Sequence, residues 1–246
     1  MELSKRLQAI ADMVTPGNRV ADVGCDHGFV SIYLFREKIA SKVFAMDLRP
    51  GPLARAKEHI ESYGCADYIE TRLSDGITAL EAGEAEAMIC AGMGGRLMAK
   101  ILSDGLKKVQ MMQELILQPQ SDLQFFREYL RENGLTIIAE DMVKEDGKFY
   151  PMMKVVPTAV ARKNGFRGEA EIFLPVFGER QQYIKDAYGP FLLEAKHPVL
   201  KEYLEVLLER NREILQNLSG QNEKAVLRRM EIEQELADIK KCLSLF

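Results

Sequence analysis

Short apolar runs and segments of helical periodicity alternate along the first part of the chain. Helical spacing of apolar residues predicts helices at residues 1–14, 29–38, 51–63 and 96–105. A further helix is predicted to begin at a cap formed by Ser121, with Gln124 in the capping box, and to end at Asn133-Gly134. The alternation predicts an α/β fold, a parallel sheet with helices on both faces. The apolar runs with the length of strands are Arg19 to Val23, Lys42 to Met46, Tyr68 to Leu73, Ala85 to Ala91 and Leu115 to Leu117.

The last two apolar runs of this part have a different connection. The runs Leu135 to Val143 and Phe149 to Val156 flank a polar stretch, Lys144 to Lys148, which contains Asp146-Gly147. Two such runs around a short polar turn predict a hairpin. The hairpin adds an antiparallel pair to the sheet, so we expect a seven-stranded, mostly parallel, Rossmann-like sheet.

The rear of the chain has a heptad-like pattern. Prolines at 175, 190 and 198 punctuate residues 162–198 and predict short helices and turns there. Two long helices on either side of Ser219-Gly220 should then pack as an antiparallel coiled-coil hairpin, with Asn211 fixing its register. We expect two domains, residues 1–160 and 161–246. The seam residues are Leu200, Leu204, Leu207, Asn211, Ile214 and Leu218, then Ile232, Leu236, Ile239 and Leu243.

Composition narrows the class of protein. The chain has 246 residues, of which 47% are hydrophobic, and it lacks both an apolar run of membrane-spanning length and a signal-like block, which predicts a cytoplasmic protein. Its net charge of −4 argues against a broad nucleic-acid surface, so any RNA contact should be a local patch. The four cysteines form no C-x-x-C pair, so neither a metal site nor disulfides are expected. Cys25 and Cys90 are interpreted as small buried residues rather than reactive thiols.

The loop after the first predicted strand is the strongest single signal. Asp22 ends that strand, and Gly24 and Gly28 permit close approach of a ligand to the backbone. A strand, an acidic residue, glycines and a helix in this order open many nucleotide-binding α/β folds. The spacing D-x-G-x-x-x-G differs from the dinucleotide motif G-x-G-x-x-G. A simple helix cap is the structural alternative for Asp22.

Similar signals follow the next three strands. Asp47 can accept hydrogen bonds from both hydroxyls of a ribose, and Asp75 from the exocyclic amine of adenine. The glycine-rich stretch Ala91 to Gly95 can admit a flat base, with Met93 as an apolar lid. A helix cap at Asp47, an Asp-Gly turn after Ser74 and a tight turn at 91–95 are the alternatives. Because carboxyl ends of parallel strands share one edge, these signals together predict one ligand site.

Several motifs carry a family resemblance. Residues Asp22 to Gly28 resemble the first motif of S-adenosylmethionine-dependent methyltransferases, usually D/E-x-G-x-G-x-G, with Asp26 in place of the middle glycine. With Leu3 to Leu7, Ala91 to Gly95 and Leu117 to Gln120, they resemble the bacterial tRNA adenine-22 N1-methyltransferases. The resemblance implies a class I methyltransferase fold with a C-terminal coiled-coil domain, S-adenosylmethionine as donor and tRNA as substrate. The Asp/Asn-Pro-Pro-Tyr motif of many amino-group methyltransferases is absent.

The resemblance also implies that Asp26 lies near the reacting atoms. Asp26 would accept a hydrogen bond from adenine N6 and stabilise the developing cation, or remove an N6 proton; both roles stay open. His27 would orient the substrate or this carboxylate, although a structural role is equally open. We expect Lys5, Arg6, Arg96 and Lys100 to contact RNA, aided by basic pairs in the tail at 228–229 and 240–241. The expected donor-binding residues are Asp22, Gly24, Cys25, Gly28, Asp47, Leu48, Ser74, Asp75, Gly76, Ala91, Gly92 and Met93.

Three other functions remain as alternatives. A class I methyltransferase could act on another RNA, a protein or a small-molecule nitrogen. A noncatalytic protein with a degenerate donor fold is disfavoured by the intact acids Asp22, Asp47 and Asp75. A nicotinamide-dependent oxidoreductase is disfavoured by the glycine spacing and the extra hairpin. The sequence leaves the oligomeric state open between a monomer and a dimer formed through the coiled coil.

Overall fold

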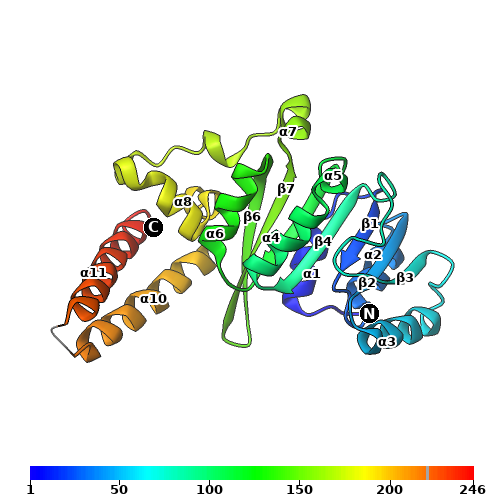
Figure 1. Ribbon diagram of the computed structural model, residues 1–246, viewed down its shortest axis with the longest axis horizontal. Coiled ribbons are helices and arrows are strands. Elements are labelled where there is room, and N and C mark those ends of the chain that lie inside the picture. The colour runs from blue at the N-terminus through cyan, green and yellow to red at the C-terminus, as the bar shows by residue number, and fades with distance from the viewer. Residues whose placement is uncertain (220–221) are drawn as a thin grey trace. The chain divides into compact units, whose positions relative to one another are not determined.

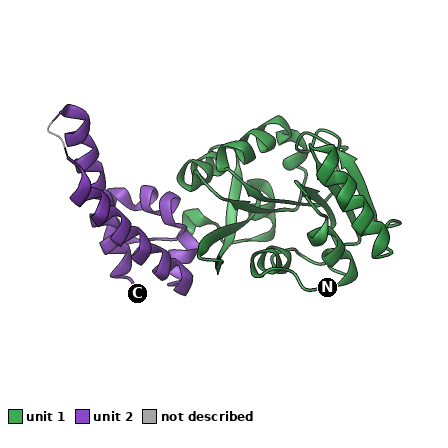
Figure 2. Cartoon of the chain, turned by 90° about the horizontal axis from the view of Figure 1, so that it is seen from below, with its two compact units in different colours: residues 1–171 green, residues 172–246 purple. Residues whose placement is uncertain are grey.

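The computed structural model describes residues 1–219 and 222–246 (Figure 1). The chain forms two compact units, Met1–Glu171 and Ile172–Phe246 (Figure 2). The division expected after residue 160 falls within the helix α7 (Thr158–Asn164). No helix in the described ranges combines the length and apolarity needed to cross a bilayer.

A seven-stranded sheet forms the centre of the first unit, in the order β3-β2-β1-β4-β5-β7-β6. The strands β1 to β5 are parallel, and β7 joins the sheet antiparallel to β5. This arrangement confirms the predicted fold class. The strand bounds are β1 Arg19–Val23, β2 Lys42–Asp47, β3 Ile69–Leu73, β4 Ala87–Met93, β5 Glu114–Pro119, β6 Leu135–Glu145 and β7 Lys148–Pro157.

Helices cover both faces of this sheet. From β1 the chain adds β2 and β3 on one side, and then returns to add β4 and β5 on the other side. Because the crossovers between parallel strands are right-handed, the helices that precede this change of direction lie on one face of the sheet and those that follow it lie on the other. Thus α1 packs on α2 and α2 on α3, whereas α4 packs on α5 and α6 (Figure 1). The helix bounds are α1 Lys5–Asp12, α2 Phe29–Arg36, α3 Pro50–Ser62, α4 Gly95–Asp104, α5 Leu106–Val109 and α6 Leu123–Glu132, followed by α7 and the 3-10 turn η1 Glu169–Glu171.

Two helix starts differ from expectation. The first helix begins at Lys5 rather than Met1, because Ser4 Oγ accepts a hydrogen bond from Leu7 N and caps it. The cap of α6 is Asp122, in the left-handed region at φ 54°, and its side chain makes no capping bond. The predicted Ser121 cap and capping box are therefore wrong. The backbone turns here because Ser121 O accepts a hydrogen bond from Gly95 N, at 3.0 Å, where α4 begins.

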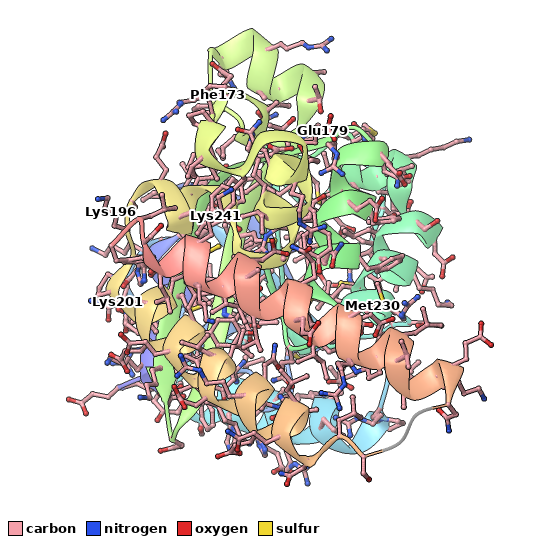
Figure 3. The ribbon with its side chains drawn as sticks, turned by 90° about the vertical axis from the view of Figure 1, so that its left-hand side faces the viewer. Phe173, Glu179, Lys196, Lys201, Met230 and Lys241 are labelled. Carbon is pink, nitrogen blue, oxygen red and sulfur yellow. The ribbon has the colours of Figure 1, made fainter. Side chains whose placement is uncertain are left out.

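The second unit consists of helices. Short ones, η2 Pro175–Arg180, α8 Gln181–Tyr188 and α9 Pro190–Glu194, precede α10 Pro198–Asn217 and α11 Glu223–Leu243. The two long helices pack side by side, and Asn211 is buried between them, where its Nδ2 donates to Glu235 Oε2 at 2.9 Å. Figure 3 shows Met230 on α11 and Lys201 on α10, and both side chains are exposed. The predicted break between the two helices is at Ser219-Gly220, and Gly220 lies outside the described residues.

Some expected seam residues are less buried than their pattern suggests. Leu207, Ile214 and Leu218 are half-buried, whereas Leu200 and Leu204, nearer the short helices, are fully buried. A pair of helices covers only one side of each seam residue. Leu207, Ile214 and Leu218 therefore keep one side open to solvent, whereas Ile232 in the middle of α11 is fully buried.

Candidate functional site

A pocket of about 510 Å³ opens at the carboxyl ends of β1 to β4. The loops after these four strands all contribute to its wall, as the strand pattern predicts. Of the expected donor-site residues, Gly28 alone does not line it. The predicted residues that do are Asp22, Gly24, Cys25, Asp26, His27, Asp47, Leu48, Ser74, Asp75, Gly76, Ala91, Gly92 and Met93.

Asp22 is a buried carboxylate at the base of this pocket. It pairs in register with Ala45 of β2 and Ile89 of β4, so it stands in the middle of the sheet. Ser31 Oγ of α2 donates to Asp22 Oδ2 at 2.6 Å. Burial raises the pKa of Asp22 to about 6, and the Ser31 hydrogen bond lowers it while nearby Asp47 raises it. A buried acid in this state favours a cationic partner in the pocket.

The loop after β1 is held by backbone bonds. The amides of Gly24 and Cys25 both donate to Met46 O, at 2.8 and 2.9 Å, which turns the chain sharply above β2. Gly28 has φ 74° and caps α2, and a Cβ there would lie 3.3 Å from Ala56 Cβ of α3. Gly28 thus allows helix packing beneath the pocket, and its contact with the donor stays a prediction.

Asp26 and His27 lie at the mouth of the pocket. Asp26 has φ 49°, the left-handed region in which Asp and Asn are the most tolerated residues after Gly. Its side chain is 61% exposed, and Oδ2 lies 3.7 Å from His27 Nε2. The His27 ring stacks on Phe29, and the His27 carbonyl lies 2.9 Å from His59 Nδ1. The histidine is therefore fixed in place while the carboxylate faces solvent.

Asp47 presents a second buried carboxylate one strand away from Asp22. Its Oδ1 accepts a hydrogen bond from Arg49 N at 2.8 Å, and Oδ2 accepts one from Asp26 N at 3.4 Å. The Arg49 side chain is largely exposed, with Nε 3.8 Å from Oδ1. The neighbouring Leu48 side chain is also exposed, which places an apolar surface beside this acid.

The loop after β3 is internally bonded. Ser74 Oγ donates to Gly76 O at 2.9 Å and accepts from Ala79 N at 3.1 Å, so its hydroxyl shapes the loop. Asp75 next to it is exposed. Gly76 has φ 56°, and a Cβ there would lie 2.9 Å from Ile101 Cγ2 of α4. The loop thus directs the Asp75 carboxylate, and not the Ser74 hydroxyl, to solvent.

The glycine-rich loop after β4 packs against the β1 loop. The Met93 side chain crosses Gly24, whose missing Cβ would otherwise lie 2.3 Å from Met93 Cε. Gly92 has φ 78°, and a Cβ there would lie 3.4 Å from Arg6 Nη1 and 3.6 Å from Gln120 Nε2. The bare backbone at Gly92 therefore leaves space for two polar side chains from other elements.

The two cysteines beside the pocket are buried thiols. Burial raises the pKa of Cys90 to about 12, and burial together with nearby carboxylates raises the pKa of Cys25 above its usual range. Cys90 Sγ lies 3.7 Å from Met93 Sδ. Neither thiol is activated as a nucleophile at neutral pH, which supports the interpretation made from sequence.

The four expected RNA-contacting residues are dispersed. Lys5 is exposed, whereas Arg6 turns into the pocket wall and does not share the exposed side of α1. Arg96 Nε lies 3.1 Å from Asp122 Oδ1, and Lys100 Nζ lies 2.6 Å from Asp104 Oδ2. Carboxylates thus neutralise two of the four cations, and their contact with RNA stays a prediction.

Sequence reasoning assigned no role to several residues that shape this site. Gln118 and Gln120 flank Pro119 at the end of β5, and their only signal in the sequence is the motif that they share with the resembling family. Ser31 lies within the apolar run of α2, with no local signal of its bond to Asp22. Within the described ranges, no cluster of His, Cys, Asp and Glu has the composition of a metal site.

Comparison with known proteins gives the family. Residues 3–153 match a family model described as a methyltransferase domain. The chain belongs to this methyltransferase family. It is 37% identical over 153 residues to the tRNA (adenine(22)-N(1))-methyltransferase of Bacillus subtilis, a match that spans 62% of this chain and 64% of that protein.

Solved structures match over nearly the whole chain. The B. subtilis m1A22 tRNA methyltransferase TrmK has a TM-score of 0.84 at 28% identity, covering 98% of this chain and 99% of that one. A Streptococcus pneumoniae protein in complex with S-adenosyl-L-methionine has a TM-score of 0.82 at 28% identity, covering 98% and 100%. The likeness therefore includes the helical second unit of this methyltransferase as well as its sheet.

Proposed function

We propose that this methyltransferase transfers the methyl group of S-adenosylmethionine to N1 of an adenine in tRNA, with A22 as the target. The observation that supports this proposal most is a row of acids at neighbouring strand ends around one pocket. Asp22 is the last residue but one of β1, Asp47 is the last residue of β2, and Asp75 follows β3. The similarity to a tRNA (adenine(22)-N(1))-methyltransferase supports the choice of base.

The chemistry of each acid fits one part of the donor. The buried Asp22, with its raised pKa, suits the ammonium group of the methionine part. Asp47 suits the two ribose hydroxyls, and the exposed Asp75 suits the adenine amine. When bound, the donor supplies an electrophilic methyl group on a sulfonium. Gly24 and Gly92 make room for Met93, Arg6 and Gln120, the side chains that line the pocket around such a ligand.

The target adenine must enter edge-on from outside. Its N1 lone pair lies in the plane of the ring, on the edge used for base pairing, so the base has to leave its stack at a cost of a few kcal/mol. Asp26 at the pocket mouth is placed to accept a hydrogen bond from N6 and to stabilise the positive charge that alkylation creates. His27, fixed by Phe29 and His59, limits the positions of that carboxylate.

Binding of a whole tRNA requires more cations than the pocket offers. The second unit exposes Lys196, Lys201 and Lys241, labelled in Figure 3, and Lys241 belongs to one of the two basic pairs predicted from sequence. We assign the second unit a share in tRNA binding and none in donor binding. The proposal places the enzyme in the cytoplasm, where tRNA is available.

One experiment tests the activity and its target together. Unmodified tRNA transcripts with either adenine or guanine at position 22 are incubated with the protein and S-adenosylmethionine, and their nucleosides are analysed by mass spectrometry. We expect 1-methyladenosine from the adenine transcript alone. Absence of methylation in both transcripts contradicts the activity, and equal methylation of both contradicts the target.

A further inference from the structure

Gln120 follows β5 directly and lines the pocket with an exposed side chain. Its backbone amide donates to Met93 O at 2.9 Å, which ties the end of β5 to the loop after β4. Its side-chain Nε2 lies beside Gly92, where a Cβ would be 3.6 Å away. The backbone of Gln120 is therefore fixed, and its carboxamide stands next to the bare backbone of the loop after β4.

The carboxamide of Gln120 differs from that of its neighbour Gln118. Gln118 is buried, its Oε1 accepts a hydrogen bond from Arg6 Nη1 at 3.0 Å, and its Nε2 donates to Pro119 O at 3.2 Å. The side chain of Gln120 makes no hydrogen bond within the ranges that the structure describes. A carboxamide carries two N–H donors and one acceptor oxygen. Gln120 thus offers a ligand a donor and an acceptor side by side.

The strand order indicates which ligand meets this side chain. Asp47 and Asp75, assigned above to the ribose and the adenine of the donor, follow β2 and β3, on the other side of β1 from β5. Asp26 after β1 and Gln120 after β5 instead stand on either side of the loop after β4. Two strand spacings of about 4.8 Å separate them by roughly 10 Å, which leaves room for one purine with a hydrogen bond on each side. Gln120 is therefore placed to meet the target base rather than the donor.

The reaction itself limits how the target adenine can be recognised. Its N1 has to reach the methyl group, so a protein side chain cannot cover N1. The N6 amine and N7 lie on the other edge of the ring and stay available. A glutamine pairs with both of these atoms at once, whereas guanine presents two acceptors, O6 and N7, at the same places. A free carboxamide at this position thus has the chemistry that distinguishes adenine from guanine.

We propose that Gln120 selects the target adenine, with Oε1 accepting a hydrogen bond from N6 and Nε2 donating one to N7. This inference rests on the proposed function and deepens it by naming the group that reads the base. The N6 amine carries two protons. One pairs with Gln120 on the N7 side, and the other stays available to Asp26 on the N1 side.

The test changes one atom of the target base. Transfer RNAs with adenine or with 7-deazaadenine at position 22, in which a C–H group replaces N7, are methylated by the unaltered protein, by Gln120→Met and by Gln120→Glu. The ratio of kcat/KM for the two bases is measured for each protein. Because both bases meet every protein, comparing these ratios cancels their difference in intrinsic reactivity. We expect the preference for adenine to be roughly fivefold to thirtyfold greater in the unaltered protein than in Gln120→Met, the range for a donor left unpaired.

Gln120→Glu gives an outcome that a purely structural role would not give. Its carboxylate still accepts a hydrogen bond from N6 but repels the lone pair of N7. The ratio should therefore fall below that of Gln120→Met, in favour of 7-deazaadenine. Gln113→Met replaces an exposed glutamine at the opposite end of β5, and this matched control should keep the preference of the unaltered protein. Calorimetry with S-adenosylmethionine should give the same affinity for all four proteins, which also shows that each is folded.

The remaining outcomes overturn the inference in distinguishable ways. If both Gln120 variants keep the base preference of the unaltered protein, Gln120 does not contact N7, and the proposed function stands without it. If the variants lose donor affinity and lose activity equally on both bases, Gln120 only supports the fold of the pocket. If the unaltered protein methylates neither tRNA, the proposed function fails and the inference fails with it.

Discussion

Ser31 Oγ donates a hydrogen bond of 2.6 Å to Asp22 Oδ2, and both side chains are buried. The bond joins α2 to the end of β1 and stabilises the ionised form of the carboxyl group. Burial acts in the opposite direction and is the larger effect, since the pKa of Asp22 is raised to about 6. The hydroxyl therefore keeps this acid ionised at neutral pH.

Ser31→Ala should make donor binding dependent on pH in the neutral range. Removing the side-chain bond leaves only the backbone hydrogen bond of Ser31 to oppose burial, so the pKa of Asp22 rises further, by about one to two if the bond contributes about 1.5–3 kcal/mol. Calorimetry with S-adenosylhomocysteine between pH 6 and 8.5 should show weaker binding at pH 7 and recovery at the alkaline end. Ser62→Ala, which removes a hydroxyl bonded to His59 O, is the control. Uniform weakening at every pH would indicate a packing defect.

Asp22→Asn should change the pH dependence of stability. The pKa of Asp22 rises from 3.8 in the unfolded chain to about 6 in the folded protein, so its contribution to folding is complete below pH 3.8 and lost as pH rises through 6. This loss amounts to roughly 3 kcal/mol, and asparagine does not undergo it. The free energy of unfolding of Asp22→Asn, relative to that of the unaltered protein, should therefore rise by most of this amount between pH 4 and pH 8. Urea titration at the two pH values measures the difference. A constant difference would contradict the raised pKa.

Asp26→Asn should separate catalysis from binding. Asparagine adopts the left-handed conformation at φ 49° as readily as aspartate, so the loop keeps its shape. We expect methyl transfer to fall at least about a hundredfold while donor affinity stays unchanged, because the neutral side chain no longer stabilises the cationic product. Single-turnover rates and calorimetry measure the two quantities. Asp67→Asn, at an exposed position far along the chain, is the control. Full turnover by Asp26→Asn would remove the proposed role.

Two glycine substitutions should have opposite effects on stability. At Gly95, the first residue of α4, a Cβ would lie 2.7 Å from Ser121 O and 3.0 Å from Asp122 O, both backbone atoms. Gly95→Ala should therefore destabilise the protein by about 1–3 kcal/mol. At Gly51 in α3 an added Cβ would meet no atom within 4 Å beyond its chain neighbours and its own helix backbone, and Gly51→Ala should be neutral or stabilise by up to about 1 kcal/mol. Thermal unfolding of both variants checks the contrast.

The elements of the sheet were predictable because their signals are local. The run Arg19–Val23 is bounded by turn residues, and its predicted ends agree with those of β1. The positions of Asp22 and Asp47 at the edge of the sheet were predictable for the same reason, because a residue at the carboxyl end of a parallel strand lies at that edge. The Ser121 cap was wrong because Gly95, far along the chain, sets that turn through a backbone bond.

The position of Arg6 was not predictable, for a related reason. Its place in α1 suggests an exposed side chain next to Lys5, and only the tertiary fold brings Gln118 and Tyr150 to it. The role of Ser31 depends equally on a partner from a different element. Contacts between segments distant in sequence leave no periodic pattern, so a single sequence predicts the strand ends but not the side chains that bridge them.

The anchoring of Arg6 by Gln118, Tyr150 and Glu145 makes the opening turn of α1 part of the ligand pocket. Fraying is greatest at chain termini, so occupancy of the pocket and order at the amino end should be thermodynamically linked. An affinity tag fused ahead of Met1 would therefore not be a neutral label, because any change in the docking of that first turn would alter apparent ligand affinity.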